Sequence, residues 1–154
     1  VSVSVSVSVS VSVSVSVSVS DLVIVQILDM DFKKLIAYQK SFDLGMAIYN
    51  VSKSFPKEET YSLTDQIRRS SRSVSANIAE AYRKRKYPRH YISKLTDSDG
   101  ENSETSVWLD YAFACEYLNE NLYKELTQEN IEIGKLINFM INNPGKFGVD
   151  EEGL

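Results

Sequence analysis

The chain has 154 residues, of which 43% are hydrophobic, 10% aromatic and 25% charged. This length predicts one domain, because domains usually run to roughly 100–200 residues, and the apolar content excludes wholesale disorder. The single cysteine, Cys115, excludes an internal disulfide and a multi-cysteine zinc site and suits a reducing compartment. The single histidine, His90, argues against histidine-based metal or triad chemistry. We therefore expect no cofactor and no enzymatic reaction.

Residues 1–20 are ten uninterrupted Val-Ser dipeptides. This alternation is a strand pattern, but a long uncharged strand is an aggregation template. The repeat lacks the regions of a secretory signal and the continuous apolarity of a membrane helix, and residues 21–29 are too short to span a bilayer. We expect residues 1–29 to be a translated nucleotide repeat outside the native fold, with Met30 as the biological start. A cloning artefact and a real extension are the alternatives.

From Asp31 onward the apolar residues follow the 3.6-residue period of helices. The first predicted helix covers residues 32–54 and ends before Pro56, since the residue before a proline is driven out of helical conformation. Its predicted buried stripe is Phe32, Leu35, Tyr38, Phe42, Met46, Tyr49 and Phe55.

Three more helices are predicted after the first. The second covers residues 59–86, and the third covers residues 88–119 with Pro88 at its first position. The fourth covers residues 128–142, with Thr127 as N-cap, and is followed by an acidic tail, residues 148–154, expected to be frayed. Short connections between such helices predict an all-α, antiparallel up-down four-helix bundle spanning residues 30–147.

The middle of the third predicted helix is unusually polar. Residues 96–106 include Gly100, which predicts a kink or local exposure. Residues 97–101 begin like a calcium loop, but the sixth position lacks the required glycine and the twelfth lacks the required glutamate, so we expect no metal site. This run is expected to face solvent or another subunit. Cys115, among apolar neighbours, is predicted to be a small buried hydrophobe.

Charge is segregated along the chain. Residues 66–96 hold nine Lys or Arg and one acid, whereas residues 97–154 hold three Lys and thirteen acids. In an up-down bundle the connection between the second and third helices lies at the same end as both termini, and we expect a basic cluster there. The predicted nucleic-acid-binding residues are Lys33, Lys34, Arg83, Lys84, Arg85, Lys86 and Arg89, with Lys146 as a further candidate. The interleaved rings, which suit stacking on bases, are Tyr82, Tyr87, His90 and Tyr91. The alternative is a solvated helix terminus whose cations complement the helix dipole.

Several stretches together resemble a known family. They are DFKKLIAYQK at 31–40, SFPKEE at 54–59, LTDQIRRSS at 63–71, SANIAE at 75–80, DGENSETSVWLDY at 99–111 and MINNP at 140–144. Over about residues 31–147 the chain resembles the four-helix bundle protein family, also called the 23S ribosomal RNA intervening-sequence protein family, in a branch common in Bacteroidetes-type bacteria. The resemblance implies a cytoplasmic bacterial protein that forms a ring-like homopentamer and has no established catalytic activity. A relative of similar fold works with a reverse transcriptase and its RNA, so structured RNA or a nucleic-acid enzyme is an expected partner.

Four residues match the family's pattern in the second helix, namely Arg68, Arg69, Asn77 and Glu80, while Ala81 stands where the family commonly has glycine. Their spacing also predicts helix ion pairs, Asp65 with Arg69 and Glu80 with Lys84. If Asn77 and Glu80 are buried they need partners, which Arg68 or Arg72 of a neighbouring protomer would provide.

Two functions from different classes follow from these features. In the first, the protein is a homo-oligomeric accessory that holds structured RNA at its basic end. In the second, it is an oligomeric scaffold for another protein, and the basic cluster only aids solubility. Clustered cations with interleaved tyrosines favour RNA, whereas the acidic isoelectric point of about 5.1 favours the scaffold. Neither function involves a membrane.

Overall fold

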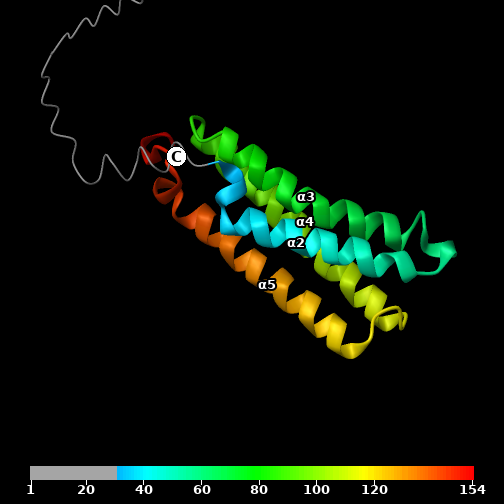
Figure 1. Cartoon of the computed structure of the whole chain (residues 1–154). Helices are drawn as coiled ribbons and strands as arrows, with labels where there is room; N and C mark the ends of the chain where they lie inside the picture. Colours follow the sequence, from blue (N-terminus) through cyan, green and yellow to red (C-terminus); the bar gives the residue numbers. More distant parts are fainter. Residues whose placement is uncertain (1–30) are drawn as a thin grey trace, which may run out of the picture.

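The computed structural model describes residues 31–154. The expectations for residues 1–29 and for a start at Met30 lie outside the described residues. Within the described part, four α-helices are present and no strands. They are α2 (Ile36–Val51), α3 (Leu63–Arg83), α4 (Pro88–Ala114) and α5 (Glu120–Asn142), and Figure 1 shows them running antiparallel in one bundle. Each helix packs on the next, and α2 closes the bundle against α5. The predicted all-α four-helix bundle is confirmed.

Short 3-10 helices flank the bundle helices. They are η1 (Phe32–Lys34), η2 (Ser52–Ser54), η3 (Lys57–Glu59), η4 (Pro144–Phe147) and η5 (Glu151–Gly153). The break before Pro56 and the start of α4 at Pro88 lie where the sequence predicts them. None of the helices in residues 31–154 has the length and apolarity that crossing a bilayer requires.

The turn from α4 to α5 differs from the prediction. Helix α4 ends at Ala114, because Glu116 adopts a left-handed conformation (φ 61°) and the Tyr117 amide donates back to the Ala112 carbonyl at 2.8 Å.

The start of α5 also differs from the prediction. The N-cap of α5 is Asn119, whose side chain accepts a hydrogen bond from the Leu122 amide at 2.9 Å. Thr127 therefore lies inside α5, and this helix begins eight residues earlier than predicted, at Glu120 instead of residue 128.

The core-facing side of α2 is made of small residues as well as large ones. Its buried residues are Ala37, Ser41, Leu44, Gly45 and Ile48. The prediction that Phe42 and Met46 are buried is wrong, since they are 51% and 43% exposed. Gly45 faces α3, where a Cβ added to it would lie in ordinary van der Waals contact, 3.7 Å from the Ser71 carbonyl oxygen. The large side chains therefore lie beside the contact between the two helices instead of within it.

Polar side chains form a buried layer at mid-height of the bundle. Asn102 on α4 and Asn130 on α5 each donate to the other's backbone carbonyl at 3.0 Å, and Asn130 also donates to the Asn102 side chain at 2.9 Å. Thr105 donates to the Ser70 hydroxyl at 2.9 Å. The predicted kink or exposure in residues 96–106 is wrong for this face of α4, because the helix is continuous and its buried Ser98, Asn102 and Thr105 side chains have hydrogen-bond partners.

Two further expectations from the sequence are corrected. Cys115 is exposed, because it follows the last residue of α4 and lies outside the packed stripe. The tail is anchored at Val149, which is 4% exposed and joins the core. Gly148 makes this approach possible with a φ of 76°, a conformation that favours glycine.

Candidate nucleic-acid interface

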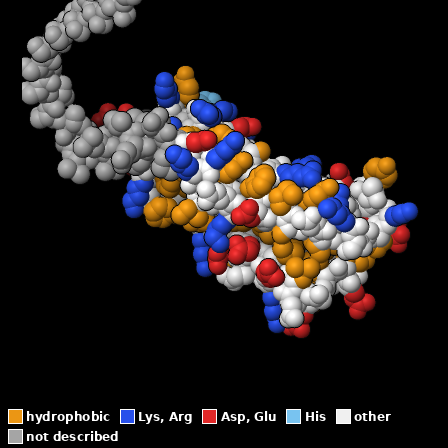
Figure 2. Space-filling view, viewed as in Figure 1, with side chains coloured by type: hydrophobic (Ala, Val, Ile, Leu, Met, Phe, Trp, Pro, Cys, Tyr) orange, Lys and Arg blue, Asp and Glu red, His pale blue; other side chains and the backbone are white. Residues whose placement is uncertain are grey.

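One end of the bundle gathers the predicted basic residues from three segments. Arg83 is the last residue of α3, Lys84 caps it, and Arg89 lies in the first turn of α4. The 3-10 helix η1 brings Lys33 and Lys34 to the same end, where α2 begins and α5 ends. We call this region the basic end, and Figure 2 shows blue Lys and Arg side chains gathered there.

Most cations of the basic end are open to solvent. Arg83, Lys86, Arg89, Lys33 and Lys34 are exposed. Among residues 31–154 none of these five, nor half-buried Lys84, lies within 4 Å of a carboxylate. The Arg83 guanidinium lies 5.8 Å from the centre of the Phe32 ring, which places it beside η1. The acidic tail reaches this end too, but its Glu151 carboxylate is bonded to the Gly145 amide at 3.1 Å.

Arg85 differs from the other predicted binding residues. Its Nε donates to the Tyr82 carbonyl at 2.8 Å, and its Nη1 donates to the Phe147 carbonyl at 3.4 Å. Its guanidinium also lies 3.7 Å from the centre of the Tyr82 ring. Arg85 therefore ties the end of α3 to η4, so its contribution is to the structure of the basic end.

The interleaved rings divide into two groups. Tyr87 is 63% exposed, and His90 lies edge-on to it with 6.1 Å between ring centres, so both are open to a ligand. Tyr82 and Tyr91 are 3% and 0% exposed and belong to the core. Burial raises the pKa of the Tyr91 hydroxyl, which donates to the Met140 carbonyl at 3.5 Å. The stacking surface that the sequence predicts is therefore confined to Tyr87 and His90.

Three of the four family-pattern residues of α3, namely Arg69, Asn77 and Glu80, contact side chains of α4. Arg69 contacts Glu104 on α4 at 2.6 Å and Glu101 at 3.8 Å, not Asp65 as predicted. Glu80 pairs with Lys94 on α4 at 3.1 Å, not with Lys84. The two predicted helix pairs are thus replaced by ion pairs between α3 and α4.

Lys94 also donates a hydrogen bond from Nζ to the Asn77 side-chain oxygen at 3.4 Å. The Asp97 carboxylate lies 3.3 Å from the same Nζ. Hydrogen bonds to Glu80 and Asp97 raise the pKa of Lys94. Asn77 and Glu80 therefore have a partner within the chain and do not need Arg68 or Arg72 of a neighbour.

A second group of cations surrounds the Tyr49 ring, and the sequence patterns did not single it out. The Lys53 Nζ and the Arg68 and Arg72 guanidiniums lie 4.5, 5.0 and 5.5 Å from its centre. Arg68 also donates from Nε to the Ser52 hydroxyl at 2.7 Å. The i,i+4 spacing of Tyr49 with Lys53 and of Arg68 with Arg72 is the signal that could have revealed this cluster.

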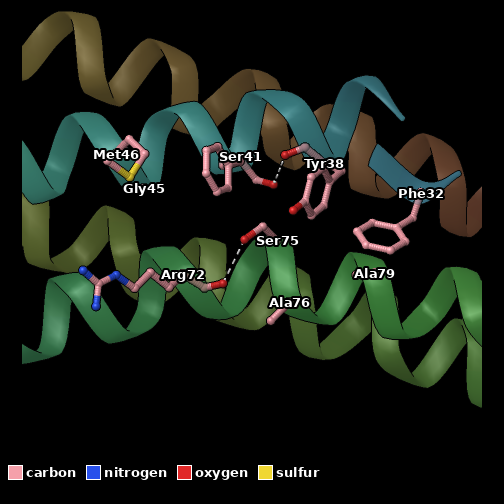
Figure 3. Close-up of a pocket in the computed structure, with 10 residues that line it drawn as sticks. Phe32, Tyr38, Ser41, Gly45, Met46, Arg72, Ser75, Ala76 and Ala79 are labelled. Carbon is pink, nitrogen blue, oxygen red and sulfur yellow. Dashed lines mark hydrogen bonds between the residues drawn. The ribbon is translucent and has the colours of Figure 1, made fainter. Parts of the chain in front are cut away.

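An apolar groove lies between α2 and α3, with a volume of about 400 Å³. Figure 3 shows Tyr38 of α2 opposite Ser75 of α3 and Phe32 opposite Ala79, whereas Met46 lies farther along α2, toward Arg72. The exposed Phe42 ring also lines the groove, as does Arg72 from the Tyr49 cluster. Large side chains beside a stripe of small ones leave a surface that another helix can fill.

A second apolar groove, of about 280 Å³, opens at the basic end itself. Its walls come from the start of α2, the end of α5 and η4, and it includes the rings of Phe139 and Phe147. Lys34 lines the same groove, and the Lys146 Nζ lies 4.8 Å from the centre of the Phe139 ring. We call it the Phe139 groove. The order of helices predicts Lys146 near the basic end, but no sequence pattern singles out Phe139.

Comparisons with known proteins agree with this architecture. Residues 33–139 match the family model of the 23S rRNA-intervening sequence protein. The chain is similar to a protein of unknown function from the S23 ribosomal protein family of Bacteroides thetaiotaomicron, whose crystal structure superposes with a TM-score of 0.64 at 29% identity. That match covers 73% of this chain and 99% of the other. No curated protein gives a significant match. With more than half of its length matched, the chain belongs to the 23S rRNA-intervening sequence protein family.

Proposed function

We propose that the protein is a non-enzymatic, homo-oligomeric accessory that binds structured RNA through its basic end. The observation that carries this proposal is the group of five exposed cations at one end of the bundle that have no carboxylate partner among the described residues. Three cations on the sides of the bundle, Lys40, Arg69 and Lys94, are instead paired with acids of a neighbouring helix. Unpaired clustered cations suit a polyanion, because each phosphate contact releases condensed counterions.

The family name supports RNA as the polyanion, since it refers to a sequence within 23S ribosomal RNA. Tyr87 and His90 add exposed rings beside the cations, and such rings stack on unpaired bases. A protein that acts on ribosomal RNA would work in the cytoplasm. A nucleic-acid enzyme bound to the same RNA is a further expected partner.

Self-association is the second part of the proposal. The groove between α2 and α3 exposes Phe42 and Met46, and the family resemblance favours a ring of five copies. A ring would repeat the basic end once per protomer, so that several weak phosphate contacts act on one RNA and raise its avidity.

The RNA-binding part is tested by charge reversal that spares Arg85, which holds the structure of the basic end. The variant is Arg83→Glu, Lys86→Glu and Arg89→Glu together. The matched control reverses Lys53, Lys57 and Lys124, three exposed lysines at the opposite end of the bundle, and so changes the net charge equally. Binding to a structured RNA is measured by fluorescence anisotropy over a range of salt concentrations.

We expect the basic-end variant to lose RNA binding and the control to keep most of it. For the unmodified protein, log K should fall against log salt with a slope of roughly −0.7 to −0.9 per phosphate contact. Equal affinity of the two variants, or no RNA binding by the unmodified protein at low salt, contradicts the proposal. Salt-sensitive binding of an acidic protein without RNA binding would instead support the scaffold function.

The assembly part is tested by light scattering at micromolar concentration. Phe42→Glu with Met46→Glu should reduce the particle to a monomer, because two carboxylates would be desolvated in the contact. Tyr61→Glu, at a 94% exposed position outside the groove, should leave the mass unchanged. A monomeric unmodified protein would contradict self-association.

A further inference from the structure

We propose that the Phe139 groove binds one unpaired base of the RNA whose phosphates contact the basic end. This inference rests on the proposed function and specifies its ligand, an RNA with a bulged or single-stranded nucleotide beside a folded segment. Phe139 is 46% exposed on α5, and Phe147 of η4 lies at 81° to it with 6.2 Å between ring centres. Two rings at right angles offer a flat base one face to stack on and one edge to contact.

The size of the groove agrees with a single base. Small-molecule pockets usually hold about 300–1,000 Å³, and a volume of about 280 Å³ lies just below that range. The apolar lining comes mainly from Leu35, Ile36, Ala37 and Leu136 in addition to the two rings. A groove of this size can accept one flat ring system.

Charge around the groove favours a nucleotide over an uncharged apolar group. The Lys146 Nζ lies 4.8 Å from the centre of the Phe139 ring, and Lys34 at the end of η1 also lines the groove. A phosphate drawn to either lysine would bring its own base to the ring. No carboxylate from residues 31–154 lies within 4 Å of either ammonium group.

The groove is also joined to the basic end through the backbone. Arg85 donates to the carbonyl of Phe147, so the connection from α3 to α4 and the ring that walls the groove are held together. The cations after α3 and the groove therefore lie at the same end of the bundle, where one RNA can contact both. Sequence-tolerant stacking on aromatic rings is the usual way in which proteins hold such unpaired bases.

The test uses the full chain and three RNA hairpins that differ at one position. One hairpin is fully paired, one carries a single bulged 2-aminopurine, and one carries an abasic bulge. Affinity is measured by anisotropy at low salt, and stacking is measured by the change in 2-aminopurine emission. The variants are Phe139→Ala and the control Phe113→Ala, which removes a 38% exposed ring of α4 at the opposite end of the bundle. Circular dichroism checks folding, and Ile36→Ser provides a second groove variant at a 62% exposed position.

We expect the bulged hairpin to bind about tenfold more tightly than the paired one, as stacking of one base implies. The abasic bulge, Phe139→Ala and Ile36→Ser should each remove most of that preference, and Phe113→Ala should keep it. Salt-dependent binding of all hairpins with equal affinity overturns the inference and leaves the proposed function standing, whereas no binding of any hairpin overturns both. A change in particle mass caused by Phe139→Ala without RNA would show that a second copy covers the groove, and it also overturns the inference.

Discussion

Polar side chains in the middle of the bundle are buried and hydrogen-bonded within the chain, whereas most of those at the basic end are exposed to solvent. In the middle, Asn102 and Asn130 exchange hydrogen bonds between α4 and α5, and both side chains are buried. At the basic end, Arg83, Lys86 and Arg89 are exposed and have no carboxylate partner among the described residues. Groups satisfied within the chain contribute to stability and helix register, whereas groups left without partners remain available for a ligand.

The same contrast separates two kinds of cation on one helix. Arg69, in the middle of α3, pairs with Glu104 at 2.6 Å. Arg83, at the end of the same helix, lies beside the Phe32 ring and has no carboxylate partner among residues 31–154. Because α4 supplies acids along its middle but not in its first turn, the position on α3 decides whether an arginine is structural or available.

The largest expected effect is in the buried polar layer. Asn102→Ala removes the donor to the Asn130 carbonyl and leaves a cavity, so we expect the free energy of unfolding to fall by about 2 kcal/mol. Asn138→Ala, which removes two hydrogen bonds at an exposed position, should cost less than about 0.5 kcal/mol. Urea denaturation measures both, and equal losses would show that burial of the asparagine pair is irrelevant.

A second variant tests whether Arg85 stabilises the fold of the basic end while its neighbour Arg89 contacts RNA. Arg85→Ala should lower the free energy of unfolding by about 1 kcal/mol, since two hydrogen bonds to backbone carbonyls are lost. It should also speed hydrogen exchange of the Val149 amide. Arg89→Ala should leave stability within about 0.5 kcal/mol and flatten the salt dependence of RNA binding. The reverse pattern would exchange the roles assigned to the two arginines.

Replacing two helical glycines by alanine compares an open position, Gly100, with a position beside the buried polar layer, Gly134. Gly100→Ala should stabilise the protein by up to about 1 kcal/mol, because nothing lies within 4 Å of the added Cβ and alanine favours helix. Gly134→Ala should not give this gain, since its Cβ would lie 3.1 Å from the Asn102 Nδ2, which is bonded to the Asn130 carbonyl. Thermal midpoints of the two variants give the comparison, and a gain of equal size at both positions would contradict it.

The smallest effect concerns Glu101, at the edge of the polar layer. Burial, followed by the nearby Glu104 carboxylate, raises the pKa of the Glu101 carboxyl in the folded state. The folded state therefore favours the protonated form, and stability is lost as the pH rises through the raised pKa. Glu101→Gln should have a higher thermal midpoint than the unmodified protein at pH 7, with the difference shrinking toward pH 4. A difference that is constant with pH would exclude this titration as its cause.

Helix identity and the main breaks were predictable because they depend on local rules. The 3.6-residue period, Pro56 and Pro88 predicted three of the four helices to within a few residues at most ends. The turn between α4 and α5 was not predictable, because Glu116 in a left-handed conformation carries none of the glycine signal that usually marks such an end. Thr127 resembled an N-cap, but Asn119 fills that role.

The candidate site was predictable in composition and only partly in geometry. The sequence placed Lys33, Arg83 and Arg89 at one end, since an up-down bundle brings those segments together. It could not show that Arg85 turns toward Phe147, or that Tyr82 and Tyr91 point into the core. Rotation of a side chain about a helix end depends on what packs against it, and this information lies far away in the chain.

By itself the sequence determined an all-α bundle, its order of helices and a basic end, because periodicity, prolines and charge act over a few residues. Only the tertiary structure decided which face of α2 is buried: Ser41 and Gly45 are buried, whereas Phe42 and Met46 are exposed. It also decided that Lys94 contacts both Asn77 and Glu80. The groove lined by Phe139 and Phe147, with Lys146 beside the Phe139 ring, was likewise visible only in the tertiary structure. These features arise where two or more helices meet, and the closeness of that meeting depends on the packing of the whole core.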